Sequence, residues 1–148
     1  KGMKGGKHMA QELLAVKLGE MDQKIGKLHG RIESSEYADA KMLQEEIENL
    51  RRECRENQEY LIQRMKYSRA KPIQKLFHSY TEIENVVDRI RREIKGVECT
   101  SGNQIFQAEE LTVFAEYALD FAMQAADYAA LLSLDAMKAQ KMLEEEEK

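Results

Sequence analysis

Carboxylates and histidines are the side chains of this 148-residue chain that could hold a metal ion. A di-iron carboxylate bundle needs glutamates and Glu-x-x-His pairs that project into a helical core. The chain has three histidines, none of which follows a glutamate by three positions: His8, His29 and His78. Glu116, Asp120 and Asp127 are spaced to share one helix face, and Asp135 follows at an apolar position. We interpret these acids as a solvated stripe or as partners of arginines on a neighbouring helix, so we expect no metal and no cofactor.

The two cysteines, Cys54 and Cys99, give no sign of nucleophilic catalysis. Cys54 falls at an apolar position of a helical pattern, which predicts a small core residue. Cys99 falls in a loop, where it is either an exposed reactive thiol or a structurally indifferent residue, and we favour the second. The chain contains no G-x-S-x-G elbow and no glycine-rich phosphate loop. We therefore expect no catalytic residues and no enzyme, and cysteines outside any CxxC or Cys/His group are typical of a cytoplasmic protein.

Charge is distributed unevenly along the chain, although the formal net charge is only −4. No acidic residue occurs from Tyr60 to Thr81, where five cations form what we call the basic corner: Arg64, Lys66, Arg69, Lys71 and Lys75. Conversely, no lysine or arginine occurs from Gly96 to Met137. The cations could complement helix C-termini and the acidic helix within one chain, or pair with acids of another subunit. They could also bind phosphate or nucleic acid, with Tyr67 and Tyr80 nearby for stacking; we favour the first interpretation.

Glycine and proline interrupt the chain at so few places that long α-helices are expected. No glycine occurs from Arg31 to Lys95, and Pro72 is the only proline. Apolar residues recur at alternating steps of three and four, which predicts amphipathic helices with coiled-coil-like seams. The expected helices span about 10–33, 36–69, 72–95 and 104–146.

Each helix boundary has its own signal in the sequence. Ser34-Ser35 followed by an acid predicts a helix N-cap, although a single helix continuing through this point is the alternative. Pro72 suits the first turn of the next helix and should keep Lys71 out of the α region. Ser101 and Gln104 are spaced as a capping box before the last helix.

The segment 104–146 differs from the others because alanines recur on several of its faces between aromatic residues. Small residues allow neighbours to approach closely, so we expect this helix to be the most buried and to form the spine of the fold. Its predicted core or interface anchors are Phe114, Tyr117, Phe121, Tyr128 and Leu132. Its expected length of ~64 Å exceeds the ~36 Å of the preceding helix, so we expect a second subunit to cover the remainder.

Together these patterns predict an all-α protein, an elongated antiparallel four-helix bundle of helical hairpins with the last helix as its spine. Residues 1–8 are interpreted as a tag or disordered arm, and 9–148 as one helical domain. We expect a non-enzymatic interaction or scaffolding protein that forms a homodimer and binds other helical proteins. The alternative is a small nucleic-acid-associated or regulatory protein that uses the basic corner. No apolar run approaches the ~20 residues that span a bilayer, so no membrane partner is expected.

Overall fold

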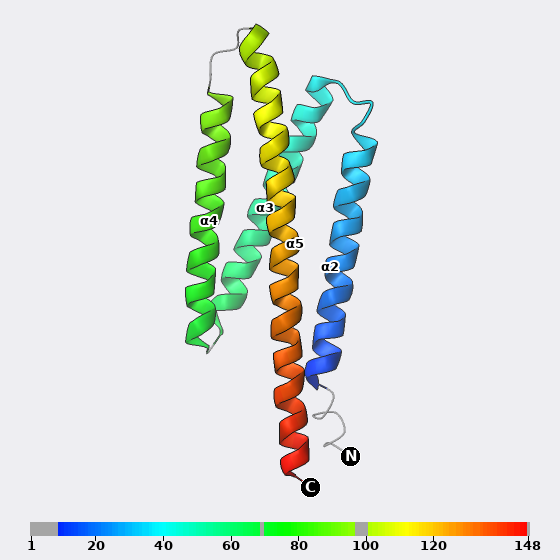
Figure 1. The fold of residues 1–148 in the computed structure, drawn as a ribbon, viewed down its shortest axis with the longest axis vertical. Helices are drawn as coiled ribbons and strands as arrows, with labels where there is room; N and C mark the ends of the chain where they lie inside the picture. Colours follow the sequence, from blue (N-terminus) through cyan, green and yellow to red (C-terminus); the bar gives the residue numbers. More distant parts are fainter. Residues whose placement is uncertain (1–8, 69, 97–100, 148) are drawn as a thin grey trace. The chain divides into compact units, whose positions relative to one another are not determined.

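The computed structural model describes residues 9–68, 70–96 and 101–147, and 92% of these residues are helical (Figure 1). The four helices of this described part are α2 (Met9–Ser34), α3 (Ala40–Lys66), α4 (Lys71–Lys95) and α5 (Ser101–Glu146). No strand occurs among the described residues, so the prediction of an all-α protein is confirmed. The tag or arm predicted over residues 1–8 lies outside the described residues.

A turn separates α2 from α3, which excludes the alternative of one continuous helix. The predicted N-cap at Ser34-Ser35 is wrong, because both hydroxyls donate to the Arg31 carbonyl at the end of α2, over 3.1 and 2.7 Å. Such bonds to a preceding carbonyl are a common local use of serine. Asp39 caps α3 instead: its carboxylate accepts from the Met42 N–H over 2.8 Å.

The start of α4 follows the prediction only in part. Pro72 lies in the first turn, as expected, but Lys71 is already helical. Ala70 is the extended residue that precedes the helix, and the Ile73 N–H closes the first turn by donating to the Ala70 carbonyl over 3.1 Å. The side chain of Ser101, which was predicted to form a capping box, is not among the described side chains. Cys99 also lies outside the described residues.

Two compact units divide the described helices between them. Unit 2 runs from Asp39 to Tyr117 and contains α3, α4 and the start of α5, whereas unit 1 pairs α2 with α5 from Ala118 onward. Helix α5 therefore contributes to both units. The prediction of one domain over 9–148 stays a prediction.

Unit 2 consists of antiparallel helical hairpins. Gln58 donates to Glu84 over 3.0 Å, and Arg51 lies 3.9 Å from Asp88, so later residues of α3 meet earlier residues of α4. At the other end of α4, the Gln107 amide of α5 donates to the Ile94 carbonyl over 2.9 Å. In unit 1, α2 and the later part of α5 also run in opposite directions (Figure 1).

None of the described side chains is fully buried. The apolar stripe of α3 that contains Cys54 is mostly exposed, at Leu43, Ile47, Cys54 and Leu61. The assignment of Cys54 to a core is therefore wrong. The half-buried positions of α3 include Gln58, Ile62 and Met65, a face rotated from the predicted one. Apolar spacing identifies a stripe on a helix, but the positions of its neighbours decide which side is covered.

Candidate functional site

Two different faces distinguish the part of α5 that belongs to unit 1. Half-buried residues recur at Ala126, Ser133, Met137 and Gln140. Their steps of seven, four and three keep them on one side of the helix. We assign this side to packing within unit 1, where α2 is the other helix.

Another side of the same helix carries an exposed apolar heptad stripe. We call this stripe the outer seam; it comprises Ala118, Phe121, Ala125, Tyr128, Leu132, Asp135, Ala139 and Met142. At 100° per residue, the centre of the outer seam lies roughly 130° around the helix from the centre of the half-buried stripe. Phe121 is 72% exposed, Leu132 63%, Tyr128 60% and Met142 52%. The expectation that α5 is the most buried helix is therefore wrong for the chain by itself.

The five predicted anchors fall into two groups. Phe114 and Tyr117 line an open groove in unit 2, of about 510 Å³, whereas Phe121, Tyr128 and Leu132 lie on the outer seam in unit 1. Phe114 is half-buried and the other four are exposed. An interface role for these residues stays a prediction.

The groove also contains residues that the sequence reasoning missed. Its apolar wall is completed by Ile94 of α4 together with Phe106 and Val113 of α5, and Glu109 and Glu110 add negative charge. Phe106, Glu110, Val113 and Tyr117 follow steps of four and three, so heptad spacing could have identified this stripe. Apolar walls with nearby carboxylates suit an apolar side chain that is accompanied by a cation.

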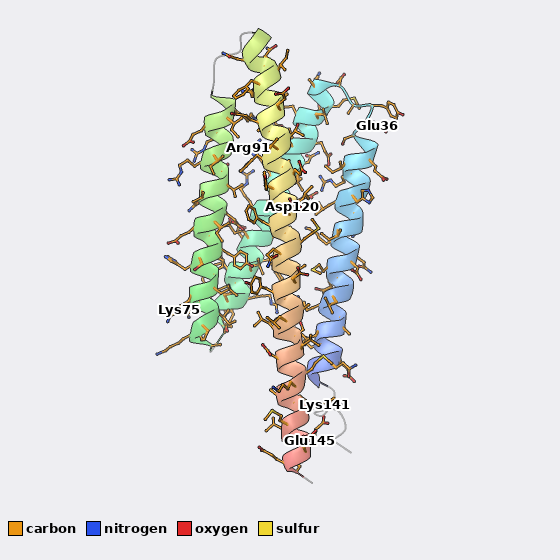
Figure 2. The ribbon with its side chains drawn as sticks, in the orientation of Figure 1. Glu36, Lys75, Arg91, Asp120, Lys141 and Glu145 are labelled. Carbon is orange, nitrogen blue, oxygen red and sulfur yellow. The ribbon has the colours of Figure 1, made fainter. Side chains whose placement is uncertain are left out.

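The basic corner lies entirely within the sequence range of unit 2, although Arg69 is outside the described residues. Lys66, Lys71 and Lys75 are exposed and, within the described part of the chain, form no ion pair. Figure 2 shows Lys75 directed away from α4. Arg64 lies over the Tyr60 ring, 6.0 Å from its centroid, within cation–π range.

The helix dipoles explain only two of the four described cations in the basic corner. Arg64 and Lys66 occupy the last turn of α3, where cations are favourable. Lys71 lies instead in the first turn of α4, and Lys75 follows one turn later, at the positive end of that helix dipole. The interpretation that these cations complement helix C-termini therefore fails for Lys71 and Lys75.

Potential metal ligands do not gather in the part of the chain that the structure describes: no group of three His, Cys, Asp or Glu residues is placed to hold an ion. Its two described histidines are exposed and pair along their own helices, His29 with Glu33 at 3.0 Å and His78 with Glu82 at 3.8 Å. Among the described helices, none combines the length and apolarity required to cross a membrane.

No family model, curated protein or solved structure matches this chain.

Proposed function

We propose that this chain is a non-enzymatic helical interaction protein that acts through self-association and binding to other helices. The outer seam is the observation that carries the proposal. Large apolar side chains are usually among the most buried in a folded protein, yet this stripe of Phe121, Tyr128, Leu132 and Met142 is more than half exposed. A contiguous exposed apolar surface of this kind is typical of an interaction site.

The heptad order of the seam supports a helical partner over an irregular one. Apolar positions at alternating steps of three and four present a straight row of side chains along one face of α5. Such a row packs against another helix by knobs-into-holes contacts. The groove lined by Phe114 and Tyr117 offers a second apolar surface on the same helix, in unit 2. We assign the protein to the cytoplasm because its two cysteines form no disulfide framework in the sequence.

Light scattering coupled to size-exclusion chromatography, with absorbance at 260 and 280 nm, tests this proposal on the 148-residue chain. We expect a molar mass of about twice 17.1 kDa and a protein-like absorbance ratio. The chain has six tyrosines and no tryptophan, so co-purifying nucleic acid would dominate the ratio. A monomer at every concentration would refute self-association.

A second candidate function is nucleic-acid binding by the basic corner. The observation in its favour is that Lys71 and Lys75 are exposed, without an ion pair among the described residues, at the positive end of α4. Phosphate contacts by such lysines weaken steeply as salt rises, because binding releases counterions. A peak with high absorbance at 260 nm that high salt converts to a protein-like ratio would support this function. A ratio that is protein-like already at low salt would exclude it.

A further inference from the structure

The order of residue sizes along the outer seam carries information about its partner. The seam consists of two rows of residues, each with a seven-residue spacing. Three of the four positions in the first row are alanine, at Ala118, Ala125 and Ala139, with Leu132 as the exception. The second row holds larger side chains: Phe121, Tyr128, Asp135 and Met142. A surface of alternating small and large residues packs to native density only against a surface with the complementary order.

The same seam supplies that complementary order when its direction is reversed. In an antiparallel pair whose two-fold axis passes α5 at the level of Ala130, Phe121 faces Ala139 of the second copy and Met142 faces Ala118. Asp135 then faces Ala125, so three of the four residues in the larger row meet an alanine, and Tyr128 faces Leu132. We propose that the outer seam is covered by the outer seam of a second copy, antiparallel and centred on Ala130; this inference rests on the proposed self-association.

A parallel pair would place identical residues opposite each other. Phe121 would meet its own copy while alanines faced alanines, which crowds some layers and leaves voids in others. The two Asp135 carboxylates would also face each other, and like charges in contact are unfavourable. In the antiparallel pair, Asp135 faces Ala125 and lies ~15 Å along the axis from its own copy. Asp135 therefore favours the antiparallel direction.

The flanks of the seam also suit a close helix pair. Ala122, Ala129 and Ala136 line one edge of the outer seam at seven-residue intervals. Such small side chains permit interaxial distances at the short end of the usual ~8–10 Å range. Because the half-buried stripe lies on a different side of α5, the second copy would contact a surface that the packing of unit 1 leaves exposed.

The exposed area is sufficient for a stable dimer. Six large side chains on and beside the seam are 52–72% exposed: Phe121, Tyr128, Leu131, Leu132, Met142 and Leu143. At roughly 200 Å² for each side chain they offer about 700 Å² per copy. Complete coverage of these side chains on both copies would bury about 1,400 Å², which falls within the ~1,200–2,000 Å² of standard interfaces.

Cysteine crosslinking in the full chain tests both the direction and the register. In a background with Cys54→Ser and Cys99→Ser, a tagged copy carries Ala125→Cys and an untagged copy carries Asp135→Cys. We expect rapid oxidation to the tagged–untagged heterodimer when the two are mixed. The matched control replaces Ala125→Cys by Ala130→Cys, which lies away from the outer seam and should not crosslink to the untagged copy.

Each outcome separates the antiparallel seam pairing from the proposal that the chain self-associates. A dimer by light scattering in which Ala125→Cys crosslinks only to itself indicates a parallel pair, and a dimer without either crosslink indicates another surface. Both overturn the antiparallel seam but leave self-association intact, whereas a monomer overturns both. If a cysteine lowers helicity, nitroxide labels on Asp120→Cys give a second measurement. We expect them ~30 Å apart along the axis in the antiparallel pair, whereas a parallel pair would place them side by side.

Discussion

Replacing Phe121 by alanine should weaken self-association without unfolding the chain. The Phe121 side chain is 72% exposed, so about 140 Å² of its roughly 200 Å² is available to a partner. Alanine would retain a small part of this contact, and the loss of about 100 Å² corresponds to ~2.5 kcal/mol per copy at ~25 cal/mol/Å². Two copies lose ~5 kcal/mol, which raises the dimer dissociation constant by ~10³- to 10⁴-fold.

Sedimentation velocity over a dilution series measures this change, and circular dichroism measures the helix content. Alanine has a higher helix propensity than phenylalanine, so helicity at a matched oligomeric state should not fall. Met123→Ala is the matched control, because Met123 is 60% exposed on the same helix but lies off the outer seam. We expect it to change the dissociation constant by less than ~3-fold. An unchanged dissociation constant in Phe121→Ala, or equal weakening by both variants, would refute the reasoning.

Two further predictions concern the stability of the helices. Asp39→Ala removes the carboxylate that accepts from the Met42 N–H at the start of α3. The free energy of unfolding measured in urea should fall by ~1 kcal/mol, and an unchanged midpoint would show that this cap contributes nothing to stability. Gly26→Ala should raise the free energy of unfolding by ~1 kcal/mol, because the residue is helical and an added Cβ meets no atom within 4 Å. A lower melting temperature for Gly26→Ala would show that this position contacts another molecule, because the single chain leaves it open.

The helices themselves were predictable because their determinants are local. Scarce glycine and proline and the three-and-four apolar spacing indicate the four described helices, and the break after α2 was predicted as a turn. The N-cap of α3 was not predicted correctly, because several polar residues compete near one helix boundary and backbone geometry decides between them. Ser35 bonds back to the carbonyl of Arg31, and Asp39 takes the capping role.

Burial was less predictable than helix formation because it depends on the number and placement of neighbours. The sequence identified Phe121, Tyr128 and Leu132 as core or interface anchors, but their exposure in the single chain required the structure. Cys54 shows the same limit, since its position on an apolar stripe does not bury it. The groove was missed for a related reason: Ile94 joins it from α4, and contact between helices is invisible to spacing within one helix.

Two methionines on α5 provide the most direct test that self-association covers the outer seam. Met142 lies on the seam and Met123 lies off it, with exposed fractions of 52% and 60% in the single chain. Oxidation of both by dilute peroxide, followed by mass spectrometry, compares their accessibility at low and high protein concentration. We predict that Met142 becomes protected at high concentration while Met123 oxidises at an unchanged rate. Equal rates for Met142 at both concentrations, in a sample that light scattering shows to be dimeric at the higher one, would contradict the account.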